Sequence, residues 1–233
     1  RQVAEGGANA FYNGPIAVAI VRTLNRLGSV MTREDLKAHH STWETPISID
    51  YHGVTILECP PNGQGLAALM AMGIANGLDL AALAWDSPER IHLMVEAMRL
   101  AFADARQYIA DPMHVDVPTD ALLHADYLAA RRALISPNAA MQPPAYGMPL
   151  RGSDTVYLSA VDGEGNACSF INSLYMGFGS GIVAEGTGVF LQNRGANFEL
   201  DPHHPNVVAG GKRPYHTIIP GMALKDGALF STI

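Results

Sequence analysis

Apolar and polar residues follow two different periods along this chain. Apolar positions that recur every three or four residues predict helices at residues 15–27, 32–39, 66–76, 87–108 and 125–135. Alternation in twos predicts strands at residues 47–49, 54–58, 156–161, 167–175, 188–192, 217–219 and 222–224. A last apolar run at residues 228–233 indicates a strand that stops in mid-course, so we interpret the chain as a fragment of a longer protein.

Two helix starts carry specific signals. Thr32 begins a sequence close to a capping box, with Asp35 three residues later. Ser87, followed by a proline, is a strong N-cap for the helix at residues 87–108. In that helix Glu96 and Arg99 are spaced to pair. One apolar face is expected to pack in the core, and it consists of Ile91, Met94, Val95, Met98, Phe102 and Ala105.

A predicted hairpin spans residues 155–175. Its turn, residues 162–166, contains two glycines and an asparagine, which tolerate positive φ. Thr155 lies at the start of the first strand and Ser173 near the end of the returning strand, so two hydroxyls are expected side by side. Residues 136–153, which precede the hairpin, are rich in proline and glycine with little periodicity, and they predict an irregular, flexible connector.

Composition and charge exclude several classes of function. The chain has 233 residues, a net charge of −7 and 48% hydrophobic residues, as expected of a globular protein without a nucleic-acid partner. The uncharged run at residues 65–78 is too short to span a bilayer, which needs about 20 residues, so no membrane segment is predicted. His203 and His204 are adjacent, but no second cluster has ligand spacing, so neither a metal nor another cofactor is predicted.

Thr155 is a candidate nucleophile only if a base removes its proton. No histidine lies close to it in the sequence. Cleavage of the bond before Thr155 would create an α-amino group with an ordinary pKa of about 8, which suits general-base work. Ser173 could then orient or share the Thr155 proton. The alternative is that Thr155 is only a β-branched residue that begins a strand.

Several short motifs, in order and spacing, make the chain resemble the gamma-glutamyltransferase (gamma-glutamyltranspeptidase) family. The resemblance runs essentially from end to end. Its motifs are Ala10-Phe11-Tyr12-Asn13-Gly14, Thr32-Arg33-Glu34-Asp35-Leu36, Thr45-Pro46-Ile47, Pro60-Pro61, Ala101-Phe102-Ala103-Asp104, Asp111-Pro112, Asp154-Thr155, Val161-Asp162, Gly165-Asn166, Phe178-Gly179-Ser180-Gly181-Ile182 and Lys212-Arg213-Pro214.

The resemblance implies an α+β fold, the αββα sandwich of N-terminal-nucleophile hydrolases, here truncated at both ends. It implies self-cleavage between Asp154 and Thr155. Residues 1–154 would be the mostly helical C-terminal part of a large subunit, and residues 155–233 the β-rich N-terminal part of a small subunit. Catalysis would pass through an acyl ester on Thr155, which water or an amine acceptor releases from a small-molecule amide substrate. Ser173 matches the second catalytic threonine of the family.

The predicted substrate-binding positions depart from the family pattern. Members that act on gamma-glutamyl groups hold the substrate's α-amino group with asparagine, glutamine and aspartate, where this chain has Tyr175, Arg194 and Asn197. They hold the α-carboxylate with two serines, where this chain has His216 and Thr217. Arg194 would repel an ammonium group and attract a carboxylate. The run Leu191-Gln192-Asn193-Arg194-Gly195 resembles the branch of cephalosporin acylases and oxamate amidohydrolases. Together with the departures, it predicts amides of acid-bearing acyl groups, with gamma-glutamyl amides such as glutathione less favoured.

The resemblance also implies that parts of the site lie elsewhere. The family's oxyanion Gly-Gly pair would follow residue 233 and a carboxylate-binding arginine would precede residue 1, so these 233 residues alone are expected to be inactive. Two alternatives stay open. One is a non-catalytic relative that keeps the scaffold for binding. The other is a metal-dependent amidase that uses His203, His204 and His216.

Overall fold

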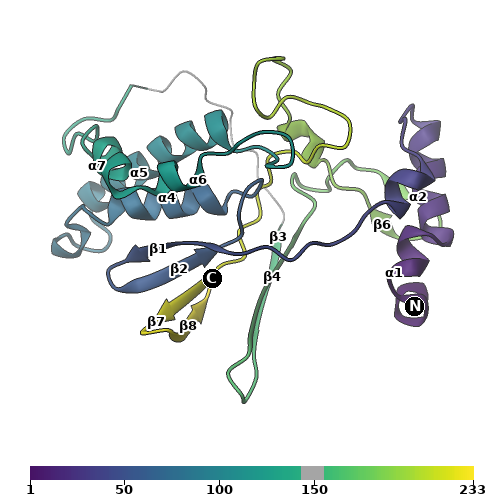
Figure 1. Cartoon of the computed structure of the whole chain (residues 1–233), viewed down its shortest axis with the longest axis horizontal. Helices are drawn as coiled ribbons and strands as arrows, with labels where there is room; N and C mark the ends of the chain where they lie inside the picture. Colours follow the sequence, from purple (N-terminus) through teal and green to yellow (C-terminus); the bar gives the residue numbers. More distant parts are fainter. Residues whose placement is uncertain (143–154) are drawn as a thin grey trace. The chain divides into compact units, whose positions relative to one another are not determined.

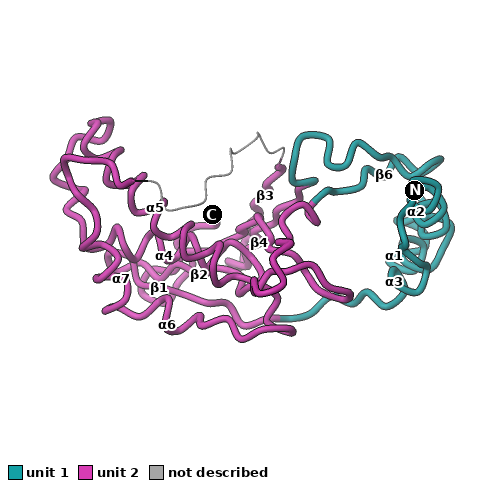
Figure 2. Tube along the Cα trace, turned by 90° about the horizontal axis from the view of Figure 1, so that it is seen from above, with its two compact units in different colours: residues 1–43, 152–154, 174–193 teal, residues 44–151, 155–173, 194–233 magenta. Residues whose placement is uncertain are grey.

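The computed structural model of the chain describes residues 1–142 and 155–233. Asp154 and most of the predicted connector at residues 136–153 lie outside the described residues. The described residues form two compact units, residues 1–43 with 174–193 and residues 44–142 with 155–173 and 194–233 (Figure 2). Both units therefore combine residues from before and after position 155. None of the described helices has the length and apolar character that a membrane crossing needs.

The smaller unit contains α1 (Gln2–Tyr12), α2 (Pro15–Arg26), α3 (Arg33–Lys37) and the short paired strands β5 (Val183–Ala184) and β6 (Val189–Phe190). The predicted helix at residues 15–27 is confirmed, and its buried residues Ile16 and Ile20 pack with Ala184. The predicted capping box is confirmed too, because Thr32 and Asp35 exchange hydrogen bonds. α1 was not predicted. Its two glycines disfavour a helix, and the helix is kinked at Gly7, where φ is 57°.

The larger unit is a four-stranded antiparallel sheet with helices packed against it, together with a separate hairpin (Figure 1). The sheet has the order β1-β2-β7-β8, so the hairpin before position 155 pairs with the hairpin after it. Its strands are β1 (Ile47–Tyr51), β2 (Val54–Glu58), β7 (Met222–Lys225) and β8 (Ala228–Thr232), and the separate hairpin is β3 (Thr155–Val161) with β4 (Ala167–Ser173). Its helices are α4 (Gly65–Ala75), α5 (Pro88–Tyr108), α6 (Thr119–Leu123) and α7 (Ala125–Arg132), with short 3-10 turns at Leu80–Ala82 and Arg194–Asn197.

α4 is the central element of this unit. It is apolar almost all round, as the sequence predicted for a buried helix, and it packs against the sheet on one side and against α5 on the other (Figure 1). Leu69 of α4 shares a buried cluster with Ile56 of β2 and Ala223 of β7. Burial of these side chains stabilises the fold by roughly 1.5–3 kcal/mol for each large one. α6 was not predicted, because a five-residue helix leaves little periodic signal.

The predicted apolar face of α5 is wrong except at Ala105, which is buried. Ile91, Met94, Val95 and Met98 are each 45–52% exposed. The buried face instead carries Glu96, Ala97, Leu100, Ala101, Asp104 and Ala105. Small alanines let α5 approach α4 closely, and this close packing outweighs the stripe of larger residues on the other side. The predicted N-cap of Ser87 is confirmed, since its Oγ accepts from Arg90 N at 3.2 Å.

The predicted pair of Glu96 and Arg99 is confirmed, and it holds the described start of the connector. The two side chains form an ion pair on α5. Glu96 Oε2 accepts from Met141 N at 2.9 Å, and Arg99 Nη2 donates to Met141 O at 2.9 Å. Residues 136–142 are therefore anchored to α5 at Met141.

The predicted strand at residues 217–219 is wrong. This segment runs between Pro214 and Pro220, which have no N–H to give to a ladder. Its neighbour His216 makes only an isolated parallel bridge, to Gly63. The returning strand of the hairpin also ends at Ser173, two residues before the predicted end.

Glu58 ends β2 with a buried carboxyl group that is 5% exposed. A Cβ at Gly65 or at Gly221 would lie 2.8 Å from one of its carboxylate oxygens, so both neighbours approach it as bare backbone. Its Oε2 has no hydrogen-bond partner among the described residues. Burial raises the pKa of Glu58 to about 7, although a hydrogen bond from the Cys59 N–H opposes the shift.

This pKa predicts how stability depends on pH. Below pH 4.5 the Glu58 carboxyl is protonated in both the folded and the unfolded chain, so its ionisation does not lower the free energy of unfolding. Between pH 4.5 and 7 only the unfolded chain releases the proton, so the free energy of unfolding falls, and above pH 7 the full cost is present. Glu58→Gln should therefore stabilise the full-length protein at pH 8, by at most about 3 kcal/mol, and should have no such advantage at pH 4.5.

Urea unfolding at the two pH values measures this difference. Glu164→Gln, at an exposed turn position, is the matched control and should show no pH-dependent gain. An equal change in stability at both pH values for Glu58→Gln would contradict the assignment.

Candidate active site

The β3–β4 hairpin brings the two predicted hydroxyls together. Its register pairs Thr155 with Ser173 at one end and Val161 with Ala167 at the other. Thr155 Oγ1 donates to Ser173 Oγ at 3.2 Å. A slip of one residue would turn one of the two side chains to the opposite face, so the hydroxyl pair depends on this register.

The turn and the neighbouring strand hold that register. Asp162 closes the turn, where its Oδ1 accepts from Glu164 N and Asn166 N, both at 2.9 Å. Ser169 Oγ donates to Ile233 O at 3.0 Å beside the end of β8. Ser159 hydrogen-bonds to Thr232 on the same face of the hairpin. The hydroxyl-bearing face is therefore fixed at both strands.

Arg194 places a buried positive charge beside the hydroxyl pair. Arg194 is the first residue of the short turn Arg194–Asn197, and it is 3% exposed. The guanidinium donates to Thr217 Oγ1 at 2.6 Å and to Ser173 O at 3.5 Å. The structure thus brings together four of the predicted site residues, Thr155, Ser173, Arg194 and Thr217, from segments far apart in the sequence.

His216 lies next to these four residues, and hydrogen bonds of its backbone hold it there. His216 N donates to Asn62 O at 3.0 Å, and Gln64 N donates to His216 O at 2.7 Å. The ring Nδ1 accepts from Ile218 N at 3.4 Å, so the neutral ring carries its proton on Nε2. Burial, and then the charge of Arg194, lower the pKa of His216 to about 4. The imidazole is therefore uncharged at neutral pH.

The other predicted positions have different surroundings. Asn197 directs its side-chain Nδ2 to the backbone, where it donates to Tyr215 O at 3.0 Å. Tyr175 belongs to the smaller unit, where its φ of 82° is unusual for a non-glycine residue. Asp154, the other side of the predicted cleavage site, lies outside the described residues.

Two buried residues near these segments were not predicted. Asn206, 4% exposed, donates from its side chain to Asn197 O at 2.6 Å and accepts from Tyr215 N at 3.1 Å. No periodic signal marks it, because it lies in an irregular loop. Glu58 could have been found, since it occupies the inward-facing position of a strand after Val54 and Ile56.

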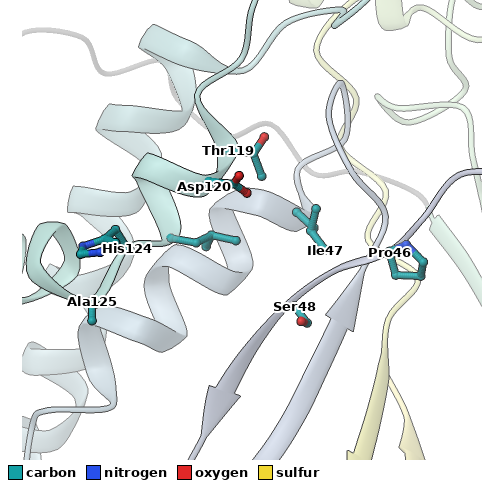
Figure 3. A pocket seen from close by; sticks show the side chains of 8 residues that line it. Pro46, Ile47, Ser48, Thr119, Asp120, His124 and Ala125 are labelled. Carbon is teal, nitrogen blue, oxygen red and sulfur yellow. The ribbon is translucent and has the colours of Figure 1, made fainter.

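The metal-dependent alternative concerns His203, His204 and His216. In the part of the chain that the structure describes, no three His, Cys, Asp or Glu side chains are grouped to hold a metal ion. His204 Nδ1 accepts from Asn206 N at 3.0 Å. A hollow of about 520 Å³ between β1 and helices α6 and α7 contains none of the predicted site residues (Figure 3). Asp120 and His124 line it, without a nucleophile paired to a base.

A sequence model of the family described as gamma-glutamyltranspeptidase matches residues 1–233. The chain belongs to the gamma-glutamyltranspeptidase family. The predicted family resemblance is thereby confirmed, and with it the α+β fold of the N-terminal-nucleophile hydrolases that the solved relatives share.

Three relatives illustrate the family. The glutathione hydrolase-like YwrD proenzyme of Bacillus subtilis is 40% identical over 97% of this chain, and the oxamate amidohydrolase proenzyme of Klebsiella pneumoniae is 38% identical over 97%. A cephalosporin acylase from Bacillus halodurans has a TM-score of 0.86 and 41% identity over 99% of this chain. The chain spans 42% of each of the two curated relatives and 41% of the solved one.

Membership of the gamma-glutamyltranspeptidase family suggests a test of whether the Thr155–Ser173 hydroxyl pair has a chemical role. Ser173→Ala removes the acceptor of the Thr155 hydroxyl, so we expect any Thr155-dependent reaction of the full-length protein to slow about tenfold, the equivalent of one hydrogen bond. Ser173→Thr keeps a hydroxyl and should retain most of the rate. Chain cleavage, followed by intact mass over time, is the measurement.

Ser48→Ala is the matched control, since it deletes a hydroxyl from an exposed position of another strand, β1. Equal rates for Ser173→Ala and the wild type would show that the pair has no chemical role.

Proposed function

We propose that this chain is part of a self-cleaving amidohydrolase or acyltransferase that uses Thr155 as an N-terminal nucleophile. Its substrates are amides whose acyl group carries a carboxylate. The observation that carries the proposal is the hydroxyl pair of Thr155 and Ser173 with the buried guanidinium of Arg194 beside it.

The first step of the proposal is self-cleavage. The Thr155 hydroxyl attacks the carbonyl carbon of residue 154, the C–N bond breaks, and an ester links residue 154 to Thr155 Oγ1. Water then opens the ester. Residue 154 keeps a carboxylate and Thr155 gains a free α-amino group, whose ordinary pKa of about 8 lets it act as a base. The proenzymes among the relatives support this step.

The second step is acyl transfer through the same oxygen. The new amino group takes the Thr155 proton as Oγ1 attacks the substrate amide. The amide C–N bond breaks, the proton leaves with the amine product, and an acyl ester remains on Thr155. Water, or an amine acceptor, then breaks the ester and restores the hydroxyl. Ser173 Oγ, 3.2 Å from Thr155 Oγ1, accepts from and orients the nucleophile.

The charge of the site supports a carboxylate as the recognised group. Arg194 is always protonated, and its planar guanidinium matches a carboxylate with two parallel hydrogen bonds. Its hydrogen bond to Thr217 Oγ1 fixes the orientation of the group. One relative is named as an oxamate amidohydrolase, and oxamate is an amide whose acyl group carries a carboxylate.

The same charge disfavours gamma-glutamyl amides. Their α-ammonium group would lie in the field of a buried guanidinium, which repels it. Asn197 stands where the resemblance places an aspartate in gamma-glutamyl-specific members, and its side-chain amide donates to Tyr215 O. Glutaryl or oxamyl amides are therefore proposed as better substrates than glutathione.

Intact mass of the full-length protein tests the nucleophile. The wild type should split into two pieces, with the small piece beginning at Thr155. Thr155→Ala should remain whole and inactive, because it has no hydroxyl to attack the preceding carbonyl. Thr45→Ala, at an exposed position, is the control and should split normally. A wild type that stays whole would instead support a non-catalytic relative that keeps the scaffold for binding.

Arg194→Gln tests the substrate class. We expect the preference for a glutaryl anilide over its uncharged glutaramide analogue to fall roughly 10–100-fold, because a hydrogen bond to a charged group contributes about 1.5–3 kcal/mol. The measurement is the ratio of kcat/KM values for the two substrates. Arg194→Lys keeps the charge but loses the planar fork, and should keep part of the preference.

Lys37→Gln, which removes an exposed positive charge, should leave the preference unchanged. A wild type that hydrolyses gamma-glutamyl anilide far faster than glutaryl anilide would overturn the proposed substrate class.

A further inference from the structure

Asn206 lies between two segments that carry the proposed site. One segment is the turn Arg194–Asn197, which begins with the buried arginine. The other is residues 215–217, which end with the threonine that this arginine contacts. An irregular loop, residues 198–214, connects the two segments, and side-chain bridges help to set the spacing between them.

The two ends of the Asn206 side-chain amide bridge the segments. Nδ2 donates to Asn197 O at 2.6 Å, and Oδ1 accepts from Tyr215 N at 3.1 Å. The backbone partners also fix the orientation of the amide, because a carbonyl accepts and an N–H donates. The bridge thus sets the distance between Asn197 and Tyr215.

Two further bonds run parallel to this bridge. Asn197 Nδ2 donates to Tyr215 O at 3.0 Å, so both backbone groups of Tyr215 are bound. Arg194 Nη1 donates to Thr217 Oγ1 at 2.6 Å. The hydrogen bond from Arg194 to Thr217 requires the spacing that the Asn206 bridge and the Asn197–Tyr215 bond maintain. At 2.6 Å, it leaves little room for the segments to move apart.

The backbone of Asn206 holds the amide rigidly in place. Its N–H donates to His204 Nδ1 at 3.0 Å, and its carbonyl accepts from Glu199 N at 3.0 Å. The residue is 4% exposed. Water therefore competes little for the amide, and loss of either end would leave a buried polar group without its partner.

We infer that Asn206 is a positioning residue that sets the preference for carboxylate-bearing acyl groups by fixing the guanidinium of Arg194. The inference rests on the proposed function, because that preference is measured on the proposed reaction. The side-chain hydrogen bonds of Asn206 go to Asn197 and Tyr215 rather than to Thr155. It acts through the spacing between the Arg194 turn and Thr217.

The chemistry of the bridge requires an asparagine. One end must donate and the other must accept, within the length of one amide group. Asp has the same shape, but it places a carboxylate oxygen against Asn197 O and removes the donor. Gln keeps both functions and adds a methylene, so the two ends no longer fit the same spacing.

Asn206→Asp in the full-length protein tests the inference. The ratio of kcat/KM for glutaryl anilide to that for its uncharged glutaramide analogue should fall about tenfold, the equivalent of one hydrogen bond. Self-cleavage should remain complete, and kcat/KM for the uncharged amide should stay within about threefold of the wild type. Asn138→Asp, the same change at an exposed position, should leave the ratio unchanged.

A double-mutant cycle shows whether Asn206 acts through Arg194. With Arg194→Gln already present, Asn206→Asp should change the ratio no further, because the charge that it positions is gone. If Asn206→Asp fails to fold, Asn206→Gln takes its place in the cycle, with a smaller expected fall of about threefold.

Each outcome decides between the claims. Equal losses on both substrates, with the ratio of the wild type, would reduce Asn206 to a structural role and overturn the inference. An unchanged ratio in Asn206→Asp would overturn it as well, while a wild-type preference for the acid leaves the proposed function in place. A wild type without any preference overturns the proposed substrate class and this inference together.

Discussion

The antiparallel pairing of β2 with β7 is the contact on which the larger unit depends. It joins residues 55–57 to residues 222–224, so a hairpin from before position 155 and a hairpin from after it form one sheet. Ile56 and Ala223 are paired across these strands and are buried together under α4. Asp111 adds a second tie, since its buried carboxylate accepts from Arg213 N at 2.8 Å. If the chain is cut before Thr155, these contacts keep the two pieces in one fold, and the new amino terminus stays beside Ser173.

The sequence could predict what depends on local pattern. The hairpin is the best example, because strand alternation and a glycine-containing turn, both visible in the local sequence, predict Thr155 near Ser173. The face of α5 is the opposite case. A helical pattern shows that an apolar face exists, but the partner decides which face is buried. Since α4 is apolar on all sides, the close fit of Ala97, Ala101 and Ala105 against it outweighed the larger Met94 and Met98.

The periodicity of apolar residues could not predict the part of the site that contains Arg194. Arg194 and Thr217 are 23 residues apart, in segments without regular pattern, and only the family resemblance indicated that both belong to the site. Asn206 carried no such indication, because its role comes from two backbone groups that folding brings to its side chain. The adjacent histidines at 203 and 204 drew attention to metal binding instead, whereas the His204 ring accepts from the backbone of Asn206. Polar side chains that bind backbone are hard to find from sequence, since any irregular loop contains candidates.

The proposed preference for an anionic ligand over a zwitterionic one rests on the charges around Thr155. An amino-acid head group needs a partner of each sign, while the described residues around Thr155 contribute a buried cation, Arg194, and neutral groups at Asn197 and Thr217. Burial is the larger cause that lowers the pKa of His216 to about 4, and the positive charge of the neighbouring Arg194 lowers it further. An ammonium group placed in the same region would experience the same repulsion, and a carboxylate would experience the corresponding attraction.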